Sequence, residues 1–248
     1  MQDSPRLFID SATIAPLAEG TTLDLAPGHA RYLGTVLRLG PEAPVRIFNE
    51  RDGEWSGVLT AIRKDRGTLR VTHQTRMPMA TTGPILVFAP LKRDATDLVI
   101  RMGTELGVSR FMPVTTARTN THRVNTTRWH AIAVEAAEQC ERLDVPVIDE
   151  LRALSAVVSA WPSAGTLYAA VERHRVATPT ARQRQVGGGD GLLIGPEGGF
   201  SPEETQWLLT QDRIEALSLG TLILRADTAA CAGLAYLTLH RESSVETE

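Results

Sequence analysis

Hydrophobic and polar positions follow two different rhythms along the chain. In residues 1–76 short apolar stretches alternate with polar ones, as in VRIF and TLRVT, which is the period-two pattern of half-buried strands. The stretches 44–50, 54–62 and 67–75 are therefore predicted to form an antiparallel sheet or small barrel, with a helical patch over residues 29–39 before them.

A strand-then-helix rhythm begins at residue 84, after an aperiodic, proline-containing linker at residues 77–83. Strands that alternate with helices form a parallel sheet covered on both faces. We therefore expect an α/β domain over residues 84–248, with a basic connection at 173–185 before its fourth strand. The predicted strands are 85–90, 110–116, 166–172, 191–195 and 214–220, and the predicted helices are 95–107, 126–142, 227–240 and one that begins at Pro202.

Composition narrows the class of protein. The chain of 248 residues has a net charge of -3, so bulk positive potential alone does not explain binding to nucleic acid. Residues 1–76 carry ten Arg or Lys against nine Asp or Glu, and 24 of the 26 basic residues of the chain are arginine. Arginine suits bidentate phosphate contacts. Genomic base composition also raises its share, so RNA binding and an ordinary solvated surface both stay open.

Several classes of protein are disfavoured. No apolar run approaches the roughly 20 residues that cross a bilayer, and the N-terminus lacks the layout of a signal peptide, so we expect a cytoplasmic protein without a membrane segment. Cys140 and Cys231 lie far apart, and the six histidines show no metal-ligand spacing, so neither a disulfide scaffold nor a metal site is expected. The chain has no GxSxG motif, which disfavours a serine hydrolase.

The stretch LLIGPEGGFSPEE, residues 192–204, predicts a strand, a glycine turn and a capped helix. Ser201 and Glu204 have the spacing of a capping box, and Pro202 takes the first helical position. A loop at the carboxyl end of a strand is where ligands bind in α/β sheets, and a tight turn is the structural alternative. Glu197 in the centre of the turn would repel a phosphate, and the spacing matches no nucleotide-phosphate motif.

A second candidate loop is LSLGTLILRADTAA, residues 217–230. Arg225 comes just before the helix that Asp227 opens, although the N-terminal end of a helix dipole favours anions. This placement indicates that Arg225 is held for a partner such as a carboxylate or an RNA phosphate. An ion pair with Asp227 is the structural alternative.

The helix over residues 126–142 has an apolar stripe with polar groups beside it. Glu138 and Arg142, four residues apart, predict a surface ion pair as their simplest role. The stripe comprises Trp129, Ile132, Ala133, Ala136, Ala137 and Cys140.

Five segments carry a likeness to one family. They are VLRLG (36–40), TELGVSRFMPV (104–114), AVEAAEQCERLDVP (133–146), LLIGPEGGFSPEE (192–204) and LSLGTLILRADTA (217–229). In this order they resemble the RsmE-type methyltransferases, which modify N3 of a uridine in 16S ribosomal RNA (rRNA). The resemblance spans nearly the whole chain from Arg6, and GPEGG followed by an ILR motif is specific in combination.

The resemblance implies an α/β fold in two domains. Residues 1–76 would form a PUA-like RNA-binding barrel, and residues 84–248 a SPOUT-class methyltransferase domain with a parallel sheet and a trefoil knot. The resemblance also implies S-adenosyl-L-methionine (SAM) as cofactor and a homodimer with residues of both subunits around each active site. The implied partner is 16S rRNA, within the 30S subunit.

Site residues carry over where the motifs match. Arg225, at the end of the ILR motif, would face substrate or cofactor and is the catalytic candidate. The cofactor-binding residues implied by the resemblance are Ile194, Gly195, Pro196, Glu197, Gly198, Gly199, Leu219, Gly220 and Leu224. The RNA-binding residues implied by it are Arg6, Arg38, Glu138, Gln139 and Arg142.

Five positions depart from the family's pattern. Leu222 stands in place of an arginine, Met102 of a lysine, Ala226 of a threonine, Asp227 of a glutamate and Glu141 of a glycine. Two cations are thereby lost, which motivates the alternative of a non-catalytic RNA-binding protein that kept the fold. A further alternative is a methyltransferase of the same fold that acts on another RNA.

The chemistry implied by the resemblance is a single displacement at nitrogen. Uridine N3 must lose its proton and lie close to the methyl donor. Arg225 is the candidate for stabilising the uridine anion. The general base stays unassigned between Glu197 and Asp227, and Glu197 has two other candidate roles: holding the turn or facing the positive charges of SAM.

Overall fold

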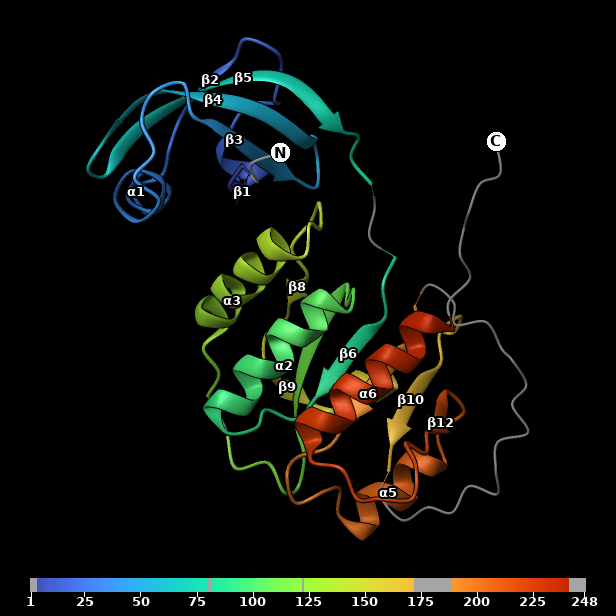
Figure 1. The fold of residues 1–248 in the computed structure, drawn as a ribbon. Coiled ribbons are helices and arrows are strands. Elements are labelled where there is room, and N and C mark those ends of the chain that lie inside the picture. The colour runs from blue at the N-terminus through green and yellow to red at the C-terminus, as the bar shows by residue number, and fades with distance from the viewer. Residues whose placement is uncertain (1–3, 80–81, 122, 172–188, 241–248) are drawn as a thin grey trace. The chain divides into compact units, whose positions relative to one another are not determined.

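The computed structural model describes residues 4–79, 82–121, 123–171 and 189–240 (Figure 1). The chain divides into two compact units. The first comprises Met1–Ala80 with Ala137–Val145, and the second comprises Thr81–Ala136 with Pro146–Glu248. The predicted linker spans the boundary near residue 80, but the predicted domains did not foresee that 137–145 belongs with the first unit. The basic connection at 173–185 lies outside the described residues.

The first unit is built on a five-stranded sheet in the order β1-β3-β4-β5-β2. β1 runs parallel to β3, and the other neighbours are antiparallel. The three predicted strands are confirmed, and the helical patch forms as a short α-helix followed by a π-helical turn. The elements are β1 (Arg6–Phe8), η1 (Ser11–Thr13), β2 (Thr22–Asp24), α1 (Pro27–Arg31), η2 (Tyr32–Val36), β3 (Pro44–Asn49), β4 (Gly53–Arg63) and β5 (Arg66–Arg76).

Alternation along these strands builds the core of the first unit. On β5, Leu69 and Val71 are fully buried whereas Arg70 between them is exposed, as expected for side chains that point to opposite faces. Val45 and Ile47 repeat the pattern on β3. α1 and η2 close this core with Ala30 and Leu33, both fully buried.

The second unit is a parallel sheet, as predicted, in the order β12-β10-β11-β6-β7-β8, with β9 paired to β7. The short strands β8 and β9 and the helix α4 had no predicted counterpart. The strands are β6 (Ile85–Phe88), β7 (Arg110–Thr115), β8 (Val147–Ile148), β9 (Arg152–Ala153), β10 (Leu167–Ala170), β11 (Gly191–Ile194) and β12 (Ile214–Ala216). The helices are α2 (Arg93–Glu105), α3 (Thr126–Gln139), α4 (Leu154–Ser159), α5 (Pro202–Leu209) and α6 (Ala226–Leu239).

Helices cover both faces of this sheet. On one face α2 and α6 lie close to the strands, because each helix has a glycine where a large side chain of the sheet packs. A Cβ on Gly103 of α2 would lie 2.7 Å from the Phe111 ring, and one on Gly233 of α6 would lie 2.7 Å from Leu192. On the other face Val87 and Leu193 pack in one apolar cluster with residues of α4 and α5. Period-two alternation therefore supplies both packing faces.

The strand order brings the loop after β6 and the GPEGG loop after β11 together at one edge of the sheet. β11 lies between β10, which precedes it in sequence, and β6, the first strand of the sheet along the chain. The carboxyl ends of β6 and β11 are consequently neighbours, and the N–H of Ala89 donates to the carbonyl of Ile194 at 3.0 Å. The trefoil knot stays a prediction.

Candidate active site

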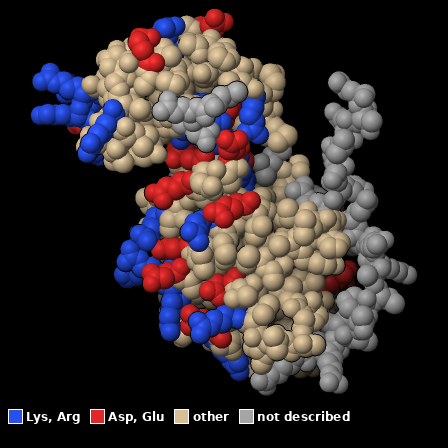
Figure 2. All heavy atoms as spheres, in the orientation of Figure 1, with Lys and Arg blue, Asp and Glu red and all other residues tan. Residues whose placement is uncertain are grey.

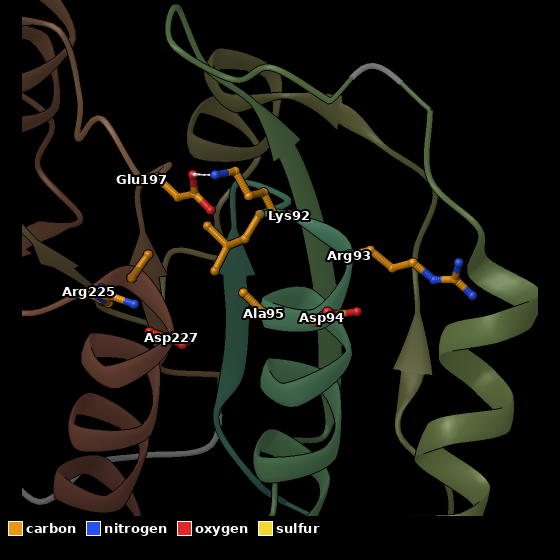
Figure 3. A pocket seen from close by; sticks show the side chains of 9 residues that line it. Lys92, Arg93, Asp94, Ala95, Glu197, Arg225 and Asp227 are labelled. Atoms are coloured by element: carbon orange, nitrogen blue, oxygen red, sulfur yellow. Dashed lines mark ion pairs between the residues drawn. The ribbon is translucent and has the colours of Figure 1, made fainter.

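One cavity of about 720 Å³ opens in the second unit at this edge of the sheet (Figure 3). Three segments line it. Leu91, Lys92, Arg93, Asp94 and Ala95 come from the loop after β6 and the start of α2, Glu197 comes from the loop after β11, and Arg225, Ala226 and Asp227 come from the start of α6. The cavity thus collects charges of both signs at the carboxyl ends of parallel strands, where ligands bind in α/β proteins.

The GPEGG loop is held in one shape from within the second unit. The N–H of Gly199, a residue with a φ of 66°, donates to the carbonyl of Pro196 at 2.8 Å and closes a tight turn. Arg118 donates from Nη1 to the carbonyl of Gly198 at 2.8 Å. The loop is therefore a tight turn, as in the structural alternative, and Glu197 lines the cavity. Ligand binding by this loop stays a prediction.

The capping box after this loop is formed as predicted. Ser201 Oγ accepts from the N–H of Glu204 at 3.1 Å, and Glu204 Oε2 accepts from the N–H of Ser201 at 3.0 Å. The other carboxylate oxygen of Glu204 accepts from the N–H of Ala117 at 2.6 Å, so one side chain ties α5 to the loop after β7.

Glu204→Ala should lower the free energy of unfolding of the second unit by about 1–2 kcal/mol, because the cap and the bond to Ala117 are lost together. Glu203→Ala is the matched control, since Glu203 lies in the same helical turn and accepts from the Ser201 hydroxyl, but its described contacts do not reach the loop after β7. Urea denaturation followed by Trp207 fluorescence, with the other tryptophans replaced by phenylalanine, measures both variants. Equal losses would contradict a special role of Glu204.

Arg225 stands at the N-cap of α6, with its carbonyl accepting from the N–H of Ala229 at 2.7 Å. The structural alternative, an ion pair with Asp227, is not formed among the described residues. Asp227 Oδ1 instead accepts from the N–H of Thr228 at 2.8 Å, and Arg225 has no side-chain partner in the described part of the chain. An exposed guanidinium beside a helix N-terminus, without a carboxylate, is available to an anionic group of a ligand.

Lys92 is a site residue that was not predicted from the sequence. Its Nζ lies 3.9 Å from Glu197 Oε2 (Figure 3). The hydroxyl of Thr96, a buried residue, accepts from the N–H of Leu91 at 2.9 Å and donates to its carbonyl at 3.0 Å, which fixes the loop that carries Lys92. The sequence offered one indication of this role: Lys92 comes shortly after the predicted strand 85–90, in a loop at its carboxyl end.

The predicted cofactor-binding residues separate into two groups. Glu197 lines the cavity together with the catalytic candidate Arg225. Ile194 is buried at the end of β11, and Gly220 adopts a φ of 113° that favours glycine. The residues that do not line this cavity are Ile194, Gly195, Pro196, Gly198, Gly199, Leu219, Gly220 and Leu224.

Arg6 departs from its expected role near RNA. Its side chain is 3% exposed, its Nε donates to Glu54 Oε2 at 2.6 Å, and its guanidinium lies 3.6 Å from the centroid of the Phe48 ring. Its other nitrogens donate to the carbonyls of Ala137, at 2.7 Å, and Arg142. We therefore correct the expectation: burial leaves Arg6 no surface for RNA and gives it a structural role within the first unit.

The other predicted RNA-binding residues all lie in the first unit. Glu138 Oε1 accepts from the N–H of Phe8 at 2.9 Å, which helps to hold 137–145 in that unit, whereas Arg142 pairs with Asp144 at 3.1 Å within the segment itself. Gln139 and Arg38 are exposed.

Glu141, which stands where the family's pattern has a glycine, has a backbone conformation that favours glycine. Its φ is 63°, in the left-handed region where a glycine is unstrained. The predicted helix over 126–142 accordingly ends at Gln139. Here the carboxylate of Glu141 accepts from Arg46 at 3.2 Å and its carbonyl accepts from Arg76 at 2.7 Å, which offsets the strain of a non-glycine residue.

The described residues hold neither a metal cluster nor a membrane-spanning helix. Within the described ranges no group of three His, Cys, Asp or Glu side chains is placed to hold a metal ion. None of the helices in those ranges combines the length and apolar character needed to span a bilayer.

Comparison with known proteins places the chain in a family. Residues 81–238 match the RNA methyltransferase domain, and residues 29–72 match the RNA methyltransferase PUA domain. The chain belongs to this family of RNA methyltransferases. The methyltransferase match includes every residue that lines the cavity, and the PUA match lies within the first unit.

Relatives of this RNA methyltransferase extend over nearly its whole length. The ribosomal RNA small subunit methyltransferase E of Rickettsia conorii is 31% identical, covering 94% of this chain and 95% of the relative, and that of Synechocystis is 30% identical, covering 90% and 74%. The crystal structure of the Neisseria gonorrhoeae enzyme bound to SAM matches with a TM-score of 0.85 at 26% identity, covering 96% of this chain and 98% of that one.

Proposed function

We propose that this RNA methyltransferase uses SAM to methylate N3 of a uridine in 16S rRNA of the small ribosomal subunit. The single observation that carries the proposal is the cavity of the second unit, where Glu197 of the GPEGG loop and the unpaired Arg225 come together. The names of the relatives support small-subunit rRNA as the substrate. The resemblance of the motifs supports uridine N3.

The cavity fits SAM in size and in charge. Its volume of about 720 Å³ lies within the roughly 300–1,000 Å³ of small-molecule sites. A carboxylate at the tip of the GPEGG loop suits a ligand with a sulfonium and an ammonium group, and it would repel a phosphate. Glu197 would face the positive charges of SAM, and the SAM-bound structures of similar proteins support SAM as the ligand.

SAM supplies an electrophilic methyl group, and the protein has to present N3 of the uridine without its proton. Loss of that proton leaves negative charge on the uracil ring and its carbonyl oxygens. Arg225, which has no side-chain partner in the described chain, is placed to stabilise this charge by donated hydrogen bonds. Because the stabilisation is stronger for the anion than for neutral uridine, it favours the reacting form.

Two carboxylates in the cavity are candidates to accept the proton. Glu197 already has Lys92 at 3.9 Å, and Asp227 accepts from the N–H of Thr228. We favour Asp227 as the base, since it lies two residues from Arg225 in the same helix start, and we assign Glu197 to the cofactor. Asp227→Asn should then lower turnover more than it lowers SAM affinity, and Glu197→Gln should do the reverse.

The remaining parts of the proposal concern assembly. We infer that the enzyme acts as a homodimer, in the cytoplasm, on rRNA within the 30S subunit. A weakly acidic protein, with a net charge of -3, suits a shaped and preformed RNA surface better than naked RNA.

The substrate is tested by mass spectrometry of 16S rRNA from a strain that lacks the gene. We expect the N3-methyluridine signal near the 3′ end to disappear and to return on complementation. Persistence of the signal would favour a methyltransferase that acts on another RNA. Calorimetry with SAM tests the non-catalytic alternative, because a protein that kept only the fold would bind none.

A further inference from the structure

The basic side chains of the first unit fall into two classes. One class is engaged inside the unit: Arg46, Arg51 and Arg142 bind carboxylates, and Arg76 donates to a backbone carbonyl, in addition to the buried Arg6. The other class is exposed and has no hydrogen-bond or ion-pair partner in the described part of the chain. It consists of Arg31, Arg38, Arg63, Lys64, Arg66 and Arg70.

These six residues, which we call the basic end, gather on adjoining elements. Arg63 and Arg66 face each other across the turn between β4 and β5. Next to the turn, the N–H of Leu25 donates to the carbonyl of Gly67 at 2.8 Å, so the chain that enters α1 lies beside it. A Cβ on Gly34 in η2 would lie 2.8 Å from Ile62, which brings η2 against the same hairpin.

Figure 2 shows Lys and Arg side chains gathered at the end of the first unit where Figure 1 places α1 and the β4–β5 turn. Three carboxylates belong to the same region: Asp65 in the turn, Asp24, whose Cα partner is Thr68 of β5, and Glu42, whose N–H donates to the carbonyl of Leu59 in β4 at 2.8 Å. None of them forms an ion pair with a residue of the basic end in the described chain. Six unpaired cations against three acids leave this region positive although the whole protein is slightly acidic.

We propose that the basic end is the surface on which the first unit holds the phosphate backbone of substrate RNA. The inference rests on the proposed function in taking RNA as the substrate. Cations that make no internal contact are free to displace counterions from phosphates, which is the main source of affinity in such interfaces. Five of the six are arginines, whose planar donors bind phosphate bidentately.

Two further observations favour RNA over another anionic partner. The match to the RNA methyltransferase PUA domain covers residues 29–72, a range that contains all six residues of the basic end. Tyr32 in η2, between Arg31 and Arg38 in sequence, is 41% exposed, and its side chain has no hydrogen bond or ring contact in the described part of the chain. An exposed ring among arginines suits stacking on an unpaired base next to the bound phosphates.

The test compares two variants that lose the same charge. Arg63→Gln/Arg66→Gln changes the basic end, and the control Arg152→Gln/Arg213→Gln removes two exposed and unpaired arginines of the second unit. Lys64 and Arg38 are left in place because their φ values of 54° and 55° lie in the left-handed region, where a substitution changes backbone strain as well as charge. A second variant, Arg66→Gln/Arg70→Gln, keeps one side of the turn unchanged.

Fluorescence anisotropy of the labelled protein, titrated with 30S subunits from a strain that lacks the gene, measures the dissociation constant between 50 and 200 mM salt, about the range over which phosphate contacts dominate. We expect both basic-end variants to bind about 10-fold more weakly, with a salt slope smaller by roughly 1.5, and the control to bind as the wild type does. In methylation assays KM for RNA should rise while kcat and SAM affinity stay unchanged.

Equal weakening by the control would overturn the proposal, because net charge alone would then account for binding. Wild-type affinity of the basic-end variants would overturn it as well. Loss of binding to phosphatidylglycerol vesicles, with RNA binding intact, would identify a membrane surface instead. If the wild-type protein binds 30S subunits but methylates no rRNA, the proposed function fails, and the anisotropy comparison still decides the basic end.

Discussion

Arg225→Ala is expected to reduce kcat for RNA methylation by about 10²- to 10³-fold, the loss typical of removing one preorganised donor to a developing anion. The side chain lines the cavity and has no partner in the described chain, so truncation breaks no internal ion pair. Its structural contribution to α6 is a backbone one, the bond from Ala229, which alanine keeps. SAM affinity should therefore stay within a few fold of the wild-type value.

Two controls separate catalysis from folding. Arg225→Lys keeps a positive charge but loses the planar donors, and we expect partial activity from it. Arg213→Gln removes an exposed arginine of the same unit that does not line the cavity, and it should leave kcat unchanged. Single-turnover assays with saturating SAM and RNA measure the chemical step. Near-normal turnover of Arg225→Ala would remove Arg225 from its catalytic role.

The hydrophobic pattern predicted the strands and helices of both units better than it predicted which strands pair with each other. Period two located β3, β4 and β5, and the strand-then-helix rhythm located β6, α2 and β7 within a few residues. These predictions succeeded because the signal lies within one element. Strands of two or three residues, such as β8 and β9, carry too few positions for a period, and neighbouring strands determine them.

Site features that depend on residues close together in sequence could be predicted. Contacts between residues that only the fold brings together could not. The capping box at Ser201 is local and was found, and Arg225 was singled out by its position against a helix dipole. Lys92 meets Glu197 only because β6 and β11 are neighbours in the sheet. Arg6 was misjudged for the same reason, since its acceptor Ala137 is 131 positions away in sequence.

Arg6→Met should destabilise the first unit by about 3–5 kcal/mol, the usual cost of leaving a buried charge without its partner. Glu54 is 2% exposed and would keep only the Thr75 hydroxyl, at 3.0 Å, and the more distant Arg46, at 3.7 Å. Arg46→Met is the control, because Arg46 is 24% exposed and its closer partner, Glu141, is 56% exposed. Its loss should cost at most about 1 kcal/mol.

The double variant Arg6→Met/Glu54→Gln removes both charges of the buried pair. We expect it to recover part of the stability that Arg6→Met loses, because no unpaired charge then stays buried. Hydrogen-exchange mass spectrometry assigns the effect to a region. Peptides from β1, β3 and residues 137–145 should lose protection in Arg6→Met, whereas those from the second unit should not. Unchanged protection together with weaker RNA binding would restore Arg6 as an RNA contact.

The same pair predicts an acid dependence. Burial raises the pKa of the Glu54 carboxyl, but hydrogen bonds from Arg6 and Thr75 and the charges of Arg6 and Arg46 outweigh burial, so the pKa lies below its ordinary value of 4.5. The unfolded chain therefore takes up this proton at a higher pH than the folded chain does. Stability from Glu54 is complete above the ordinary value and is lost as the pH falls through and below it. In Glu54→Gln this component of the acid dependence should disappear, and an unchanged pH profile of unfolding would show that other carboxylates determine it.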